Sequence, residues 1–246
     1  MKACDPKVWE NLCVGIPCGV FPMGCEQGRD DEKPLHTVRV DSFEMGSVQV
    51  RNCDFAAFIA AVGHPAPPEW RNPNLNHPDQ PVTGVSWIEA VRFCAWLSGE
   101  TGSRYDLPTE AEWEWAAMGG RIGRLYPWGD ESPAVWPQYL SRWGGDVKGP
   151  LAVGLGEPNP YGLYDMSENV HEWCRDWYQR DYYAVAPELN PGGPLQGERR
   201  ASRGGSWRHQ IKVSRCAARS SIPPHFQYAD YGFRLARYRI PESPDS

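Results

Sequence analysis

The stretch "NPYGLYDMSENVHEW", residues 159–173, places three acidic residues among apolar ones. Asp165 and Glu172 lie seven positions apart. The apolar neighbours are Met166, Val170 and Trp173. These neighbours argue against full exposure of the two carboxylates, although the alternative remains that both are solvated on a short helix. We expect that short helix in "SENVHEWCRDWY", residues 167–178.

The composition predicts one loop-rich domain. The chain has 246 residues, enough to bury a substantial core. It contains 12 Trp, 24 Pro and 25 Gly, which suits a fold held by aromatic anchors. Apolar residues recur along the whole chain, so disorder is not expected. No internal repeat or low-complexity linker divides the chain, and residues 240–246, "IPESPDS", are expected to form a flexible tail.

Charge and hydropathy exclude two classes of partner. The formal charge is -6, and no run of basic residues exceeds Arg199–Arg200, so a nucleic-acid partner is not expected. No apolar run approaches the roughly 20 residues of a membrane helix. The first residues, "MKACDPKVWENLC", lack an apolar signal region. We therefore expect a soluble, cytoplasmic protein with no membrane partner.

The cysteines leave their own state open. They lie at positions 4, 13, 18, 25, 53, 94, 174 and 216. An even count is compatible with disulfides, but nothing in the sequence marks export. The N-terminal cysteines are free, bridged or metal-bound, although a zinc site would prefer a tighter pair than Cys13 and Cys18 and a second pair elsewhere. Cys94 has the pattern of a small buried hydrophobe.

Three stretches predict helices longer than the one above. They are "RNCDFAAFIAAVG" (51–63), "SWIEAVRFCAWLSG" (86–99) and "LPTEAEWEWAAMGG" (107–120). Apolar residues recur with helical spacing in the first two. Ser86 with Glu89 and Thr109 with Glu112 have capping-box spacing, and Asn52 is expected to cap the first helix.

The predicted strands are short. They are "GVFPMG" (19–24), "HTVRVDSFEM" (36–45) and "YGFRLARY" (231–238). With few helices and short strands, the fold class is α+β with sparse secondary structure. Such a fold needs its loops held by something other than strand ladders.

Eight motifs occur in an order that points to one family. They are "IPCGVFPMG", "PVTGVSWIEAVRFCAWLS", "LPTEAEWEWAAMGG", "LYPWGD", "NPYGLYDMSENVHEW", "RGGSW", "RCAARS" and "YGFRLAR". Together they resemble the formylglycine-generating enzyme family, also called the sulfatase-modifying-factor family. The match covers residues 14–239 and leaves 1–13 as an N-terminal extension. The resemblance implies a single domain that is a variant of the C-type lectin fold.

The resemblance also implies a structural calcium ion near the opening stretch. By position, Asp165 and Glu172 match its side-chain ligands, while Glu168 and Val170 match residues that bind through backbone carbonyls. Calcium takes six to eight hard oxygen ligands of these kinds. The family's second calcium segment corresponds to residues 138–150, but this sequence departs from the pattern there and we do not predict that site.

The reactive cysteines of the namesake enzymes are missing. In those enzymes two cysteines between "GGS" and "CAARS" hold copper, and a sulfatase cysteine is oxidised to formylglycine. Here the first position is His209, the second falls near 211–213, and no Cys occurs from 205 to 215. Copper(I) is soft and selects thiolates, so we do not expect the namesake reaction. Cys216 and Cys94 match structural half-cystines of the family whose partner positions are not Cys.

Two classes of function remain. The first is a divergent oxidoreductase that does not use copper bound by two thiolates, with a redox metal that the sequence does not identify. His209 is then a candidate metal ligand or proton carrier, and Arg219 a candidate for orienting a ligand through its planar guanidinium. The alternatives are an ordinary surface histidine and a structural ion-pair partner, for example of Asp230.

The second class is a binding module for a small molecule, a protein or a peptide. Residues 207–231 correspond to the segment in which retroelement-diversified proteins of similar fold carry their variable residues. The candidate contacts are Trp207, Arg208, Phe226, Tyr228 and Tyr231. The alternative is that these aromatics pack inside a Trp-rich domain. A third possibility is an inactive paralogue that regulates an active enzyme.

Overall fold

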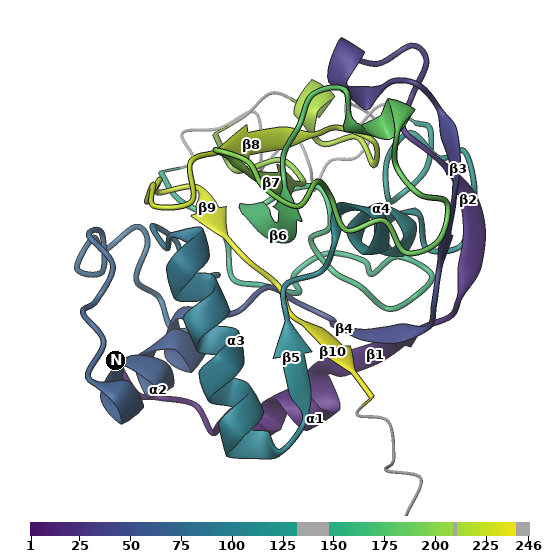
Figure 1. The fold of residues 1–246 in the computed structure, drawn as a ribbon. Helices are drawn as coiled ribbons and strands as arrows, with labels where there is room; N and C mark the ends of the chain where they lie inside the picture. The colour runs from purple at the N-terminus through teal and green to yellow at the C-terminus, as the bar shows by residue number, and fades with distance from the viewer. Residues whose placement is uncertain (132–147, 209–210, 240–246) are drawn as a thin grey trace, which may run out of the picture.

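The computed structural model describes residues 1–131, 148–208 and 211–239. In this part of the chain the strands form three small sheets (Figure 1). The first has the order β1-β4-β10-β5, with β1 Cys13–Ile16, β4 Phe43–Gly46, β10 Ala236–Tyr238 and β5 Arg104–Asp106. The second has the order β8-β7-β6-β9, with β8 Ser220–Ile222, β7 Arg200–Arg203, β6 His171–Trp177 and β9 Tyr231–Gly232. A separate ribbon pairs β2, Gly19–Met23, with β3, His36–Val40.

The three longer predicted helices are confirmed as α2 Asn52–Val62, α3 Trp87–Thr101 and α4 Glu110–Met118. Short helical turns are η1 Pro6–Val8, α1 Trp9–Leu12, η2 Asp30–Glu32, η4 Tyr182–Ala184 and η5 Ile211–Val213. Ser86 and Thr109 cap α3 and α4 as expected. Asn52, in contrast, is the first residue of α2 rather than its cap, because its amide donates instead to the carbonyl oxygens of Leu75 and His77.

The predicted helix over 167–178 is wrong. Residues 171–177 form β6, which pairs antiparallel with β7 and parallel with β9. Asp165 and Asn169 have positive φ angles of 57° and 72°, so the backbone before the strand turns in a way that a helix does not allow. Both faces of β6 are covered at its start, and therefore the polar–apolar alternation of a half-buried strand is absent.

The other predicted strands are confirmed in part. "GVFPMG" forms β2, whereas 36–45 divides into β3 and β4 in different sheets. The last predicted strand divides into β9 and β10, and residues 233–235 between them are fully buried. This segment therefore links the two four-stranded sheets through the core.

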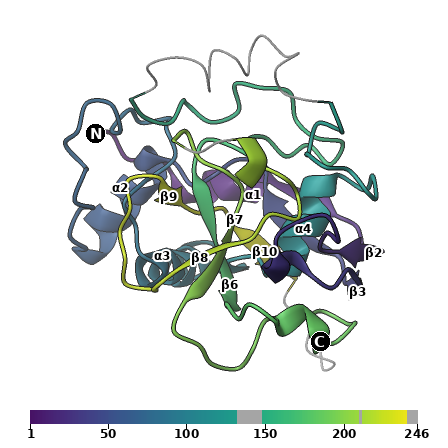
Figure 2. The ribbon, with the colours of Figure 1, turned by 90° about the horizontal axis from the view of Figure 1, so that it is seen from above.

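Two hydrophobic clusters fill the domain. One lies between the β2–β3 ribbon and α4, and the other lies around α2 and α3. Figures 1 and 2 show the ribbon on the side of the molecule opposite α2 and α3. Residues 1–13, expected to be an extension, contribute Trp9 to the second cluster, where it is completely buried. Among the described residues, no helix is both long and apolar enough to cross a membrane.

Arg203, the last residue of β7, lies in a buried charge network. Its Nε lies 3.0 Å from Glu110 Oε1 and its Nη2 2.9 Å from Glu114 Oε2. Its Nη2 also donates to the Tyr183 hydroxyl, and Arg219 shares Glu110 over 2.8 Å. Burial would raise the pKa of Glu110, but Arg219 and Arg203 outweigh it and lower this pKa. Loss of one partner would leave a buried charge uncompensated, at a cost of about 3–5 kcal/mol.

Asp176 gives this network a pH dependence. Burial, followed by the charge of Glu110, raises the pKa of Asp176 from 3.8 to about 8. A carboxyl with a raised folded-state pKa stabilises the fold most below its unfolded pKa and loses that contribution as the pH rises through its folded pKa. We predict that Asp176→Asn, which keeps an acceptor for the Glu110 N–H, reduces the fall in Tm between about pH 5 and about pH 8.

Thermal unfolding across this pH range measures the effect. The exposed Asp181→Asn is the control, because its pKa is lowered and it stays ionised throughout the range. Equal pH slopes for Asp176→Asn and the unchanged protein would contradict the assignment.

Candidate functional site

The "GGSW" segment leaves β7 and packs on the loop before β6. A Cβ on Gly205 would lie 2.2 Å from Ser214 Oγ and 2.9 Å from the Ser167 carbonyl oxygen, so no side chain fits there. The Trp207 N–H donates to the Asn169 carbonyl oxygen over 3.0 Å. The absence of a side chain at Gly205 therefore allows close packing between two loops.

Asn169 fixes the position of Trp207. Its Oδ1 accepts from the Leu151 N–H over 2.8 Å, and its Nδ2 donates to the Leu151 carbonyl oxygen over 3.2 Å. Its own carbonyl oxygen accepts from Trp207. Asn169, whose backbone is left-handed, thus joins three loops at the candidate site through its side chain and its main-chain carbonyl group.

Asp230 organises the polar groups that follow "GGS". Ser206 Oγ donates to its Oδ2 over 3.0 Å, and Arg208 Nη2 pairs with its Oδ1. Its backbone carbonyl oxygen accepts from the His171 N–H over 2.8 Å. Burial would raise the pKa of Asp230, but Arg208, the charge of His171 and the Ser206 hydrogen bond outweigh it and lower this pKa. Asp230 is therefore a charged acceptor whose main partner is Arg208.

His171 is a site residue that the sequence did not reveal. It opens β6, is buried, and stacks on Tyr231 with 4.9 Å between ring centroids. The Tyr231 hydroxyl lies 3.3 Å from Ser202 Oγ and 3.2 Å from Ser220 Oγ. Parallel pairing of β6 with β9 brings His171 opposite Tyr231, and this long-range pairing left no local signal.

These groups border an open pocket of about 360 Å³. Its lining residues are Arg29, His171, Arg208, Lys212, Val213, Arg219 and Ser220. All but Val213 carry hydrogen-bond donors, and four carry a permanent positive charge. Arg29 comes from the turn after β2 and donates to the Arg219 carbonyl oxygen, so the pocket joins segments from both ends of the chain.

Arg219 is not available to orient a ligand, which corrects the sequence-based expectation. Its guanidinium is buried, pairs through two nitrogens with Glu110, and donates to the carbonyl oxygens of Asp31 and Gln179. The structural alternative holds, but with Glu110 as partner instead of Asp230. Arg219 therefore forms a wall of the pocket and keeps its charge inside the core.

The remaining predicted contacts separate into two groups. Trp207 is half-buried and carries Arg208 over its ring at 5.4 Å, beside the pocket. Phe226 and Tyr228 are 37% and 44% exposed and contact each other edge-on, but neither lines the pocket. His209 lies outside the described residues, as does most of the second calcium segment at 138–150.

Comparison with known proteins assigns the family. The model of the sulfatase-modifying factor enzyme 1-like domain matches residues 5–239. The chain belongs to the sulfatase-modifying factor family. A formylglycine-generating enzyme of Streptomyces coelicolor is 35% identical, over 91% of this chain and 88% of that protein. The mouse inactive C-alpha-formylglycine-generating enzyme 2 is 30% identical, over 91% of this chain and 84% of that protein.

Solved structures confirm the predicted fold class, an α+β domain of the C-type-lectin-like variant found in this family. PvdO from Pseudomonas aeruginosa is 26% identical and superposes with a TM-score of 0.77, covering 92% of this chain and 94% of that one. Treponema denticola variable protein 1 is 25% identical with a TM-score of 0.77, covering 92% and 95%.

The calcium site expected for this family is only partly matched by the geometry. Glu172 Oε1 accepts from Gln49 and Arg234, and its Oε2 accepts from Trp113 and Arg234. Its charge is thus already balanced by a buried guanidinium. Gln49 Nε2 also donates to the Asp165 carbonyl oxygen over 3.0 Å, which brings the two predicted ligand residues together.

Asp165 is the better candidate for a calcium ligand. Its Oδ2 accepts from the Gly154 N–H over 2.7 Å, and it lies with Glu168 on a second pocket of about 270 Å³. Asp165 and Glu168 border this pocket and would hold a calcium ion there, whereas Val170 is not among its lining residues and Glu172 serves mainly Arg234. Calcium binding stays a prediction.

The cysteines that match family half-cystines are unpaired here. Cys94 and Cys216 are buried and free, and burial raises the pKa of both thiols well above its ordinary value. Buried neutral thiols are poor nucleophiles and poor metal ligands. Neither residue therefore replaces the missing reactive pair.

We predict that EGTA lowers the Tm of the unchanged protein and leaves the Tm of Asp165→Asn unchanged. An asparagine keeps an acceptor for Gly154 but removes the charge that calcium needs, and binding to the native state alone raises stability by mass action. Differential scanning calorimetry with and without EGTA measures this.

Glu172→Ala is the unsuitable variant for this test, because it would strand Arg234 in the core at about 3–5 kcal/mol whether or not calcium binds. An EGTA effect of equal size in Asp165→Asn, or no effect in either protein, would remove calcium from the site.

Proposed function

We propose that this chain is a ligand-binding member of the sulfatase-modifying factor family whose pocket accepts an anionic group, and that it does not form formylglycine. The observation that carries this proposal is the lining of the 360 Å³ pocket, which presents guanidinium, ammonium, imidazole and hydroxyl groups. Such a set of donors complements a carboxylate, phosphate or sulfate on a small molecule or peptide.

The charge balance around the pocket supports an anion. Arg208 is paired with Asp230, and Arg29 lies 3.3 Å from carboxylate oxygens of both Asp31 and Glu32. Lys212 is exposed and makes no ion pair with any described carboxylate. Since the side chains of Arg208 and Arg29 are 43% and 51% exposed, both can turn a guanidinium edge toward a ligand while Lys212 supplies uncompensated charge.

The missing thiolates support binding over the namesake chemistry. No described lining residue of the pocket is a cysteine, and the sequence has none from 205 to 215. A soft copper ion would lack both of the sulfurs that the namesake enzymes supply. The family includes a mouse relative named as inactive, so loss of this activity has a precedent.

The divergent oxidoreductase, which the sequence favours over the binding module, stays an untested prediction. It depends on His209, which lies outside the described residues, and on a metal that the pocket lining does not identify. The cytoplasmic location likewise stays a prediction. An oxidation product formed at this pocket would favour the alternative, whereas reversible anion binding without turnover favours the proposal.

We predict that the protein leaves a sulfatase-type peptide cysteine unchanged. The peptide would be incubated with protein, copper and oxygen, and its mass followed against the Streptomyces coelicolor enzyme as a positive control. Aldehyde formation above a no-protein control would contradict the proposal.

We predict that phosphate or sulfate binds and that Lys212→Gln weakens binding on the order of tenfold, because a charge-assisted hydrogen bond is lost. Isothermal titration at constant ionic strength, with chloride as the reference anion, measures the affinity. Lys212 is the informative position because it stabilises no described carboxylate, so its removal leaves the fold intact.

Lys7→Gln, at another exposed lysine outside the pocket, is the matched control and should bind like the unchanged protein. Equal affinities of Lys212→Gln and Lys7→Gln, or no anion binding at all, would overturn the assignment of the pocket.

A further inference from the structure

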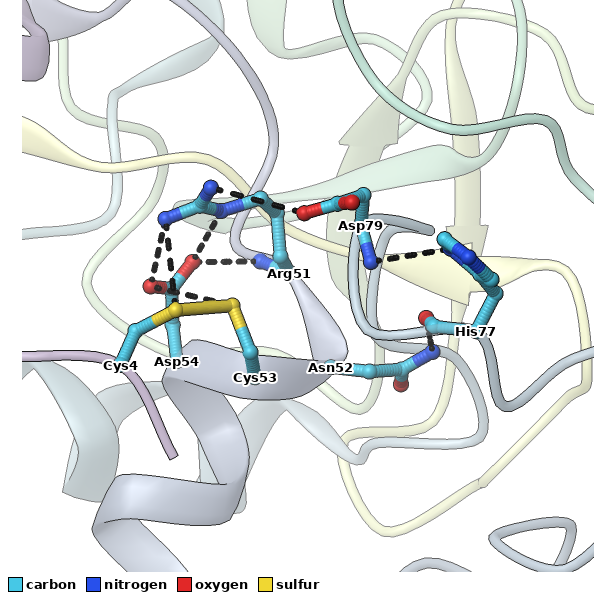
Figure 3. Close-up of a disulfide and its surroundings, with 7 residues drawn as sticks. All are labelled: Cys4, Arg51, Asn52, Cys53, Asp54, His77 and Asp79. Carbon is cyan, nitrogen blue, oxygen red and sulfur yellow. Dashed lines mark hydrogen bonds and ion pairs between the residues drawn. A yellow bond between two sulfur atoms is a disulfide. The ribbon is translucent and has the colours of Figure 1, made fainter. Parts of the chain in front are cut away.

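A disulfide outside the candidate site joins the N-terminus to α2. Cys4 pairs with Cys53 across 49 residues of sequence, and the Cys4 N–H donates to the Cys53 carbonyl oxygen over 3.1 Å. Figure 3 shows this bridge and its neighbours. Cys53 is buried, whereas Cys4 is half-buried. Cys4 is therefore the more exposed residue of the pair.

Charged groups and a helix N-terminus surround this bridge. Cys53 is the second residue of α2, an 11-residue helix, where the helix N-terminus stabilises negative charge. The Arg51 guanidinium lies 3.9 Å from Cys4 Sγ. It is held there by Asp54 at 3.0 Å and by Asp79 at 3.8 Å, as Figure 3 shows. Cys4 Sγ thus lies beside a guanidinium that stabilises a thiolate, whereas Cys53 Sγ lies between the helix N-terminus and Asp54 Oδ1, which is 3.9 Å away.

The bridge lies next to hydrogen bonds that hold the loop at 72–80 against the start of α2. Next to Cys53, the Asn52 amide donates to the carbonyl oxygens of Leu75 and His77 over 2.8 and 2.9 Å. The N–H groups of Asn52 and Cys53 donate to the carbonyl oxygens of Gln80 and Pro78. Release of Cys53 would free the helix end that makes these four hydrogen bonds.

The clamped loop in turn supports the segment beneath the candidate site. Gln80 Nε2 donates to the Pro150 carbonyl oxygen over 2.6 Å, and the Val153 N–H donates to the Asp79 carbonyl oxygen over 2.9 Å. Leu151, between them, is bound by the Asn169 side chain that positions Trp207. Hydrogen bonds therefore continue from the disulfide to the site.

The N-terminal residues also close over this loop. Met1 borders an open pocket of about 320 Å³, whose other lining residues are Trp70, Arg71, Asn76 and Pro78. Figures 1 and 2 both show the N-terminus beside α2. Farther along, Trp9 is anchored in the core independently of the bridge. Opening the bridge would thus release the first residues while the domain stays folded.

We propose that Cys4–Cys53 is a reversible redox latch that controls the order of the loop at 72–80. A thiolate of a cellular dithiol attacks the Sγ of Cys4, the more exposed residue of the pair, the S–S bond breaks, and Cys53 leaves as a thiolate and takes up a proton. The second thiol of the reductant then attacks the mixed disulfide and releases Cys4. The protein gains two electrons and two protons, and the dithiol becomes a disulfide.

The test compares the oxidised and reduced forms of the unchanged protein. Alkylation and mass spectrometry would follow the bridge as dithiothreitol is added without denaturant and then removed. We expect complete reduction and reoxidation, with amide hydrogen exchange at 72–80 and 150–153 faster in the reduced form by about tenfold or more, while α3 is unchanged. Cys18→Ser, at an exposed free cysteine, is the control and should behave like the unchanged protein.

Three outcomes would overturn the latch. They are a bridge that opens only in denaturant, a pair that does not reoxidise, and equal exchange at 72–80 in both forms. Cys4→Ser provides an independent check, because it should reproduce the exchange pattern of the reduced form without any reductant. None of these measurements depends on anion binding, so the latch and the proposed function fail separately.

Discussion

The buried ion pair between Glu172 and Arg234 holds the two four-stranded sheets together. Arg234 lies in the segment that runs from β9 to β10, and Glu172 is the second residue of β6. Trp113 of α4 and Gln49 complete the four hydrogen bonds of the carboxylate, while Arg234 donates to the carbonyl oxygens of Gly46 and Tyr164. Every donor around this carboxylate comes from a different part of the chain.

Placement of the candidate site follows from this pair. With Glu172 fixed, His171 stands at the start of β6 opposite Tyr231, and Glu172 lies opposite Arg203, the residue that precedes "GGSW". Arg203 ends β7, the strand beside β6, and its ion pair with Glu110, which Arg219 shares, holds β7 in place. Arg219 in the pocket wall is therefore buried and paired, and the exposed Lys212, Arg208 and Arg29 provide the adaptable charge. A pocket held by these ion pairs does not need the reactive cysteines of the namesake enzymes to keep its shape.

Local features of the sequence predicted local structure well. The capping residues Ser86 and Thr109 begin α3 and α4 because a cap depends on residues only three positions away. The helix predicted over residues 167–178 is wrong for the opposite reason. β6 is a strand because β7 and β9, which are distant in sequence, pair with it. Tertiary pairing overrode a helix-compatible pattern.

The sequence indicated where the candidate site lies but not which residues pair with one another there. The stretch after "GGS" does border the donor-rich pocket, as the resemblance implied. Arg219, however, finds its partner 109 residues away in Glu110, and no spacing rule connects the two. His171 was hidden inside the expected helix, and the partner of Cys4 could not be chosen among seven other cysteines. Residues that meet only through the fold are those that sequence patterns leave undetermined.

Anomalous diffraction from crystals soaked in tungstate would test the central claim most directly, because this heavy tetrahedral oxyanion reports its own position. An anion site in the pocket predicts an ordered peak within hydrogen-bond distance of Arg208, Lys212 or His171, with the Glu172–Arg234 pair unchanged beneath it. Ordered tungstate elsewhere on the molecule with this pocket empty would contradict an anion-binding function for it.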